Sequence, residues 1–288
     1  MASAPAVYRL RARNTAPRSE NRIHDDAEAR RYGFGGGLVP GVTVYAYLTR
    51  PVVAAWGPAW LERGSMDVRF LSPFYDGDEV VVAPAWEPGA RAVELRATNG
   101  EGRLCATAHA RLPDTPVDAP DPQDWPVVPL PETDRRRPAT REALRALVPV
   151  SGAGDGAEAM GTLGATFGID AGAAYVEAVG DDLAVYRGPN AVAHPGWVLS
   201  LANYVLASNV ALGPWIHTAS EVRHLGLVSA GDRLSVRARV LDLSEARGHE
   251  LVHLDVVMAV GERVVERVRH SAIYRLRLPA DPPAGQRS

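Results

Sequence analysis

The sequence of 288 residues contains no lysine, so arginine supplies all of its permanent side-chain cations. This absence excludes Schiff-base catalysis and a Walker-type phosphate loop, because both depend on a lysine amine. Cysteine occurs once, at Cys105, which excludes an intramolecular disulfide. A single thiol is consistent with a cytoplasmic location, and we expect Cys105 to be an inert residue of the core.

The sequence also lacks a long hydrophobic run and a strong excess of one charge. The apolar run 42–56 is too short to cross a bilayer and contains Arg50. Residues 1–22 contain no hydrophobic stretch of the kind found in secretory signals. The net charge of −3 gives no reason to expect a nucleic-acid partner. We therefore expect a globular cytoplasmic protein that binds neither nucleic acid nor a membrane.

An internal repeat organises the chain. Val39-Pro40-Gly41 precedes an apolar run over 42–56, and His194-Pro195-Gly196 precedes a second run over 197–212. Gly41 and Gly196 are 155 residues apart, and the two Gly-Pro pairs that end the runs are 156 residues apart. Each run is apolar on all sides, which is typical of a helix enclosed in a core. The nearly constant offset indicates one fold that occurs twice.

Alternating apolar and polar residues predict antiparallel strands around each enclosed helix, because the connections are too short for crossovers. The predicted class is therefore α+β, with two tandem repeats that each wrap a curved antiparallel sheet around a central helix. A helix over 170–179, capped by Asp170, is expected in the second repeat. The predicted units are a first repeat over 1–115, a Pro-rich linker or ordered strap over 116–150, a second repeat over 151–280, and a tail over 281–288. The predicted strands are 7–13, 66–70, 79–84, 92–98 and 103–112 in the first repeat, and 158–167, 218–225, 234–240, 250–260 and 263–278 in the second.

This order of elements resembles the double hot-dog form of MaoC-like dehydratases and R-specific enoyl-thioester hydratases. The signature of that family runs Asp-x-Asn-Pro-Leu/Ile-His, followed by a His-Gly that opens the central helix. The matching stretch here is Ser19-Glu20-Asn21-Arg22-Ile23-His24. Ser19 stands where the family has its catalytic Asp, Arg22 replaces Pro, and Pro40 replaces the His before the helix. The residues that match are Asn21, Ile23, His24, Gly33, Phe34 and Gly41.

The resemblance implies addition or removal of water across the Cα–Cβ bond of an acyl thioester, without a metal or a redox cofactor. His24 is the implied acid/base, because imidazole titrates near neutrality. The Gly41 N–H at the helix start is the implied oxyanion donor. The acyl group would be carried by coenzyme A or by a carrier protein. The two halves would form an internal pseudo-dimer, and a homodimer of the whole chain is a further candidate.

The absent Asp leaves the water without its usual carboxylate partner. Ser19 can hydrogen-bond a water but cannot accept its proton at neutral pH. Glu20 is the first candidate to replace the carboxylate, and Asp25 and Asp26 are further candidates. The alternative is that these acids are solvated loop residues, with Asp25 or Asp26 as the N-cap of a short helix over 27–32.

Further residues near the two helix starts are candidates for binding substrate. Arg187 is expected to meet the phosphates of the carrier arm, or to be a surface arginine. His194 and Trp197 are expected to line the acyl channel, or to be packing residues. In the second half no His24-like motif precedes the helix, so that half is expected to shape the acyl pocket. The candidates in the first half are Asn21, Phe34 and Pro40.

Three other functions are weighed against hydration. A double hot-dog that has lost its Asp would bind acyl thioesters or a partner without turnover, and an isomerase needs only one base and an oxyanion donor. A thioesterase usually needs a carboxylate on or beside the central helix, and 42–56 has none.

The His249-Glu250-Leu251-Val252-His253 stretch matches a zinc-protease motif, but it is predicted to be a strand. Its two histidines would then lie about 13 Å apart, too far to share one zinc.

Overall fold

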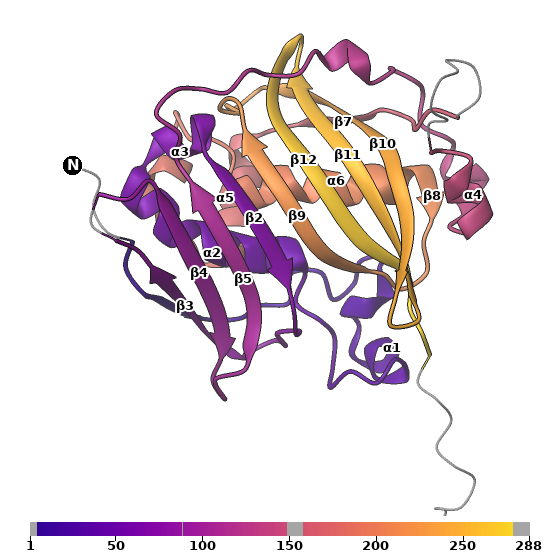
Figure 1. Cartoon of the computed structure of the whole chain (residues 1–288), viewed down its shortest axis with the longest axis horizontal. Helices are drawn as coiled ribbons and strands as arrows, with labels where there is room; N and C mark the ends of the chain where they lie inside the picture. The colour runs from indigo at the N-terminus through magenta and orange to yellow at the C-terminus, as the bar shows by residue number, and fades with distance from the viewer. Residues whose placement is uncertain (1–4, 88, 149–157, 279–288) are drawn as a thin grey trace, which may run out of the picture.

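The computed structural model describes residues 5–87, 89–148 and 158–278. Its main sheet has ten strands, and every neighbouring pair within it is antiparallel (Figure 1). These strands are β1 Tyr8–Arg11, β2 Ser65–Phe70, β3 Glu79–Ala85, β4 Ala92–Asn99, β5 Leu104–Arg111, β7 Leu163–Thr166, β9 Ile216–His224, β10 Arg233–Ala246, β11 His249–Val260 and β12 Arg263–Arg275. Their order across the sheet is β1-β3-β4-β5-β2-β9-β12-β11-β10-β7.

The two repeats meet where β2 pairs with β9. The pairing runs antiparallel from Ser65 opposite Arg223 to Arg69 opposite Ala219. Behind the sheet, helix α2 (Gly41–Trp56) packs against helix α6 (Pro195–Asn209), as Figure 1 shows. One continuous sheet around two paired helices is the arrangement expected of an internal pseudo-dimer. The predicted α+β double hot-dog architecture is confirmed.

Helix α2 is enclosed because its sequence is apolar on every side. Twelve of its 16 residues are buried, and they include Tyr45, Tyr47 and Leu48. The helix tolerates Pro51 and ends where Gly57 takes a φ of 62°, a left-handed conformation that favours glycine. Burial of so many apolar side chains is the main stabilising contribution at the centre of this half.

The remaining helices are short, apart from α5 (Ile169–Val179). Its N-cap is Gly168, and no side chain caps it. The predicted cap at Asp170 was therefore wrong. The helix begins earlier than its acidic residue suggested, so Asp170 lies inside the first turn, where a carboxylate still interacts favourably with the helix dipole.

The other elements are α1 Asp26–Arg31, α3 Pro58–Arg63, α4 Arg141–Arg145, η1 Arg22–His24, η2 Pro122–Asp124, η3 Thr133–Arg135, η4 Ala184–Tyr186, and a parallel pair of β6 Arg137–Pro138 with β8 Val210–Ala211.

The Pro-rich segment after β5 is an ordered strap over 116–148. Figure 1 shows it crossing the second half of the sheet to α4. Trp125 anchors it: the side chain is 1% exposed and packs against Val257, Ala259 and Val264. The Trp125 indole N–H donates to the Asp255 carbonyl over 3.1 Å. The predicted tail over 281–288 lies outside the described residues.

Two other expectations concern membranes and metals. None of the helices in the described ranges has the length and apolarity that a membrane crossing requires. The stretch from His249 to His253 belongs to β11, as predicted, so its two histidines are separated along a strand rather than paired on one turn of a helix.

Replacement of Trp125 by Ala should detach the strap from the sheet. We expect the free energy of unfolding in urea to fall by about 3–5 kcal/mol, because a fully buried indole and its hydrogen bond are lost. Val127→Ala is the control, since Val127 lies on the same strap and is 68% exposed. Equal effects of the two substitutions would show that the strap adds no stability.

Candidate active site

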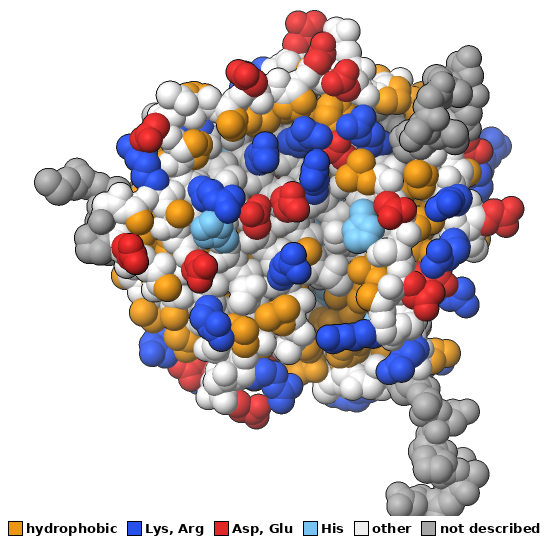
Figure 2. Space-filling view, viewed as in Figure 1, with side chains coloured by type: hydrophobic (Ala, Val, Ile, Leu, Met, Phe, Trp, Pro, Cys, Tyr) orange, Lys and Arg blue, Asp and Glu red, His pale blue; other side chains and the backbone are white. Residues whose placement is uncertain are grey.

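A cavity of about 760 Å³ lies between the two halves, where the pairing of β2 with β9 stops. Phe70 at the end of β2 and Ile216 at the start of β9 border it. The start of α2, at Gly41, also forms part of its wall. Figure 2 shows a hollow on this face with hydrophobic side chains inside it. The cavity therefore has an apolar interior and is bordered by both repeats.

His24 lines this cavity and is held in one tautomer. Its Nδ1 lies 2.7 Å from the carbonyl oxygen of Leu38. A carbonyl only accepts, so Nδ1 carries the proton and Nε2 of the neutral ring carries the lone pair. Burial lowers the pKa of His24 below its ordinary value, and the bond to Leu38 offsets part of that effect. His24 is thus a neutral imidazole near neutral pH, and its Nε2 carries the basic lone pair.

Asn21 fixes the other side of the His24 ring and joins it to the second half. Its Nδ2 lies 3.3 Å from His24 Nε2 and donates to the Trp215 carbonyl over 2.9 Å. Its Oδ1 accepts the Trp215 backbone N–H over 3.1 Å and caps η1 through the Ile23 N–H. A side chain held by this many bonds keeps a single orientation. The match of Asn21 to the family motif therefore has a structural reason.

The start of α2 presents hydrogen-bond donors beside His24. Pro40 is the N-cap and supplies no capping side chain. Its carbonyl accepts the N–H groups of Thr43 and Val44. Among the described residues, the N–H groups of Gly41 and Val42 have no such partner. Gly41 is partly exposed and lines the cavity, so the positive end of the helix dipole faces the interior.

Phe34 and Pro40 also line the cavity, but Ser19 and Glu20 do not. The Ser19 hydroxyl donates to the Asn21 carbonyl over 3.2 Å. Glu20 is 77% exposed in its side chain and forms an ion pair of 3.2 Å with Arg136. The structure brings neither side chain to the basic nitrogen of His24.

The two aspartates after His24 have local structural roles. Asp25 is the N-cap of α1 and accepts the Glu28 N–H over 3.0 Å. Asp26 accepts the Gly37 N–H over 2.8 Å and so fixes the glycine-rich loop. Neither lines the cavity. These positions match the alternative interpretation of the acids as loop and capping residues.

The residues singled out near the start of α6 lie away from this cavity. His194 is 1% exposed and accepts the Gly196 N–H at Nδ1 over 3.0 Å, while its Nε2 lies 3.2 Å from Asp181 Oδ2. Trp197 packs edge-on against Phe167 with ring centroids 5.1 Å apart. Arg187 is exposed and donates to the Asp181 carbonyl over 2.7 Å. The structure gives these residues capping, packing and surface roles.

Sequence reasoning missed His217, which lines the cavity from β9. Val222 and Ser220 point inward, so strict alternation would place Thr218 inward next. A bulge in the pairing of β9 with β12, where Ser271 and Ala272 oppose Ala219 and His217, turns His217 inward instead. No sequence motif marks this bulge.

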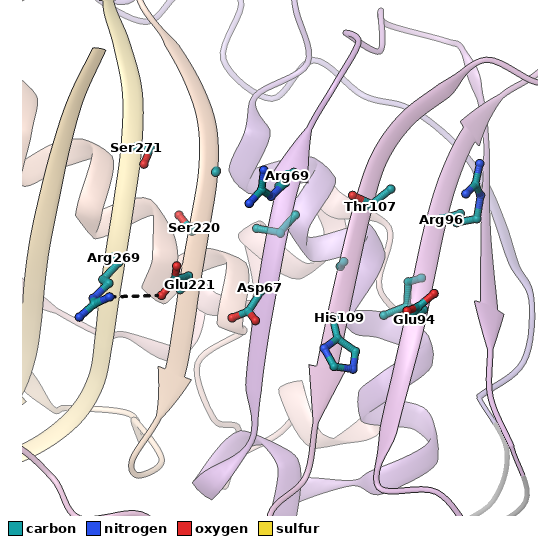
Figure 3. Close-up of a pocket in the computed structure, with 14 residues that line it drawn as sticks. Asp67, Arg69, Glu94, Arg96, Thr107, His109, Ser220, Glu221, Arg269 and Ser271 are labelled. Carbon is teal, nitrogen blue, oxygen red and sulfur yellow. Dashed lines mark ion pairs between the residues drawn. The ribbon is translucent and has the colours of Figure 1, made fainter. Parts of the chain in front are cut away.

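A second hollow of about 450 Å³ lies on the outer face of the sheet, shown in Figure 3. Charged side chains of both signs line it, and Arg269 pairs with Glu221 at 3.9 Å. The residues that line this second hollow include no enclosed imidazole and no helix end. Arg69 and Glu221 border both hollows, so this second hollow, called the outer groove below, lies next to the inner cavity. We assign the candidate active site to the inner cavity.

Comparisons with known proteins agree with this architecture. No family model matches the sequence, and no curated protein matches it either. A Chloroflexus aurantiacus protein assigned provisionally to the MaoC domain dehydratases superimposes with a TM-score of 0.58 at 13% identity, covering 96% of each chain. A conserved hypothetical protein of Mycobacterium tuberculosis with a double hotdog fold gives 0.58 at 17% identity, covering 94% of this chain and 96% of that one.

A thioesterase shares the fold as well. The acyl-CoA thioesterase II TesB2 of Mycobacterium marinum superimposes with a TM-score of 0.51 at 14% identity, covering 85% of this chain and 93% of that one. At these identities the likeness concerns the fold rather than the reaction. The continuous sheet, the paired central helices and these superpositions show that the chain is a double hot-dog protein with the architecture of the MaoC-like dehydratases.

Proposed function

We propose that the chain is a hydratase or dehydratase of acyl thioesters, with His24 as acid/base and the Gly41 N–H as oxyanion donor. One observation carries the proposal: a neutral imidazole and an unpaired helix-start N–H line the same largely apolar cavity. Enolate chemistry beside a thioester needs these two groups. Dehydratases and a thioesterase on the same fold support the thioester as substrate class.

In the direction of hydration, His24 Nε2 takes a proton from water while the water oxygen bonds to Cβ. The π electrons of the Cα–Cβ bond move toward the thioester, and negative charge grows on its carbonyl oxygen. The Gly41 N–H stabilises that charge. The imidazolium then returns the proton to Cα, so H and OH have been added and His24 is neutral again. Dehydration is the reverse.

One base performs both proton transfers in this scheme, which removes the need for the Asp that Ser19 replaces. The H and the OH then arrive on the same face of the double bond, because both come from the side of His24. Asn21 holds the ring in place and limits its rotation. Glu20, turned outward to Arg136, takes no part in this scheme.

The cavity suits an acyl chain inside and a charged carrier outside. Val44, Phe74 and Ile273 are among its apolar lining residues. Arg69 and Arg247 are exposed residues that border it. Guanidinium groups bind phosphate well, so this rim suits coenzyme A or the arm of a carrier protein.

A second candidate is an acyl-thioester-binding protein without turnover. This binding role is favoured by the scarcity of carboxylates around the cavity. Glu221 is the only carboxylate that lines the cavity in the described part of the chain, and it is an exposed residue of β9 that also borders the outer groove. The assay below separates the two candidates.

His24→Gln should lower kcat/KM by about 10²–10⁴-fold, the range lost with a general acid/base. The assay offers 2-enoyl and (3R)-hydroxyacyl thioesters of short and medium chain and follows the enoyl absorbance in both directions. His109→Gln is the matched control, because His109 lines the outer groove on β5. Thioester binding without turnover by the folded wild type would favour the binding protein.

The pH profile of kcat/KM should fall on the acid side with an apparent pKa below 6.5. His24 acts as a neutral base during hydration, and burial lowers its pKa from 6.5. Protonation therefore removes activity only as the pH falls below that ordinary value. The profile is measured between pH 4.5 and 8 with a short enoyl thioester, at pH values where circular dichroism shows the fold intact. An acid limb centred above 6.5 would contradict the assignment of His24 as the base.

A further inference from the structure

His217 faces the start of α2 from the other half of the molecule. Its side chain belongs to β9, lines the cavity, and is 5% exposed. Its Nδ1 has no hydrogen-bond partner among the described residues. This nitrogen lies 2.9 Å from where a Cβ on Gly41 would stand. A buried, unpaired polar atom beside the oxyanion donor requires an explanation.

A buried network fixes the far side of the His217 ring. Its Nε2 lies 2.8 Å from the Ser220 hydroxyl oxygen, and that oxygen lies 3.0 Å from Nδ1 of His270. The two imidazole rings are adjacent, with centroids 4.2 Å apart. His270 is 0% exposed, and its Nε2 has no partner among the described residues.

The single hydroxyl proton of Ser220 allows two arrangements of this chain. If Ser220 donates to His270, then His217 carries its proton on Nε2, and His270 keeps an unpaired N–H in the core. If Ser220 donates to His217, then His270 carries its proton on Nδ1, and its unpaired Nε2 is only a lone pair. Each arrangement leaves one buried N–H unpaired: on Nε2 of His270 in the first, and on Nδ1 of His217 in the second. His217 lines the cavity, where a bound ligand can accept this bond, whereas His270 does not line it. The second arrangement is therefore favoured, and it puts the proton of His217 on Nδ1, facing Gly41.

Both rings remain neutral near physiological pH. Burial, together with the neighbouring His270, lowers the pKa of His217 well below its ordinary value. Burial lowers the pKa of His270 to about 3. Taking up a proton would place a charge in the core, so His217 is unsuited to act as a base. A neutral ring can still donate a hydrogen bond, and its orientation is already fixed.

We propose that His217 is a second oxyanion donor, supplied by the second repeat, whose Nδ1–H joins the Gly41 N–H at the thioester oxygen. Ser220 and His270 hold the tautomer that makes this donation possible. Nδ1 is buried beside Gly41, and the Phe70 ring packs edge-on against His217 with centroids 4.8 Å apart, so this packing must open for the oxygen to reach Nδ1. The inference rests on the proposed reaction, and it places the oxyanion site at the junction of the two repeats.

The tautomer is tested without any assay of turnover. Long-range ¹H–¹⁵N correlation spectra of uniformly ¹⁵N-labelled protein identify the protonated nitrogen of each histidine. His217→Asn and His270→Asn assign the signals. We expect both rings to carry the proton on Nδ1 in the wild type, and Ser220→Ala to move the proton of His217 toward Nε2. A wild-type His217 with its proton on Nε2 overturns the proposal.

The catalytic role is tested by kinetics. His217→Leu should lower kcat by about 10²-fold or more with little change in KM, because the lost bond forms mainly in the transition state. His217→Asn retains a donor and should recover part of this loss. Ser220→Ala should lower kcat, while Ser200→Ala, which removes a hydroxyl bonded to the Trp197 carbonyl in α6, should not. Thermal unfolding checks that each variant is folded.

The possible outcomes separate the two proposals. Folded His217→Leu with kcat within threefold of wild type overturns the donor role even if hydration is established. A wild type without turnover on any thioester defeats the proposed function instead. In that case the donor proposal fails with it, and the spectra still decide which nitrogen of His217 is protonated.

Discussion

The pairing of β2 with β9 is the constraint on which the rest of the structure depends. It joins the two repeats into one sheet and holds α2 against α6 behind it. The cavity lies where this pairing ends, beside Phe70 and Ala219. Asn21 strengthens the junction, because its amide bonds both to His24 and to the backbone of Trp215 in the other repeat. The candidate site therefore exists only while the two repeats remain in register.

Three histidines at this site are shielded from solvent, and this burial controls their protonation. Desolvation lowers the pKa of His24, His217 and His270, which keeps all three rings neutral near physiological pH. Each ring then has a defined donor and acceptor nitrogen, set by its neighbours. The same effect limits stability in acid. Below pH 6.5 these three histidines take up protons in the unfolded chain but not in the folded chain. The free energy of unfolding therefore decreases as the pH falls from 6.5 toward the lowered pKa values.

Residues of both halves of this duplicated fold line one cavity. The sequence motif lies in the first repeat, and the second was expected to shape the pocket. The structure brings Trp215 and His217 of the second repeat to the cavity, while His194, at its own helix start, is enclosed by Tyr175, Tyr186 and Asp181. The two helix starts have thus diverged: one faces a cavity, and a buried histidine caps the other.

The sequence by itself determined the repeat, the two enclosed helices, most of the strands and the place of His24 and Gly41, because periodicity and helix-start signals are local. It did not determine which polar residues meet. Glu20 lies within the motif and yet pairs with Arg136, and His217 enters the cavity only through a bulge in β9. Ser220 and His270 are 50 residues apart and meet because their strands pair. Only tertiary structure decides such contacts, since strand register and burial set both which side chains meet and which protonation state they keep.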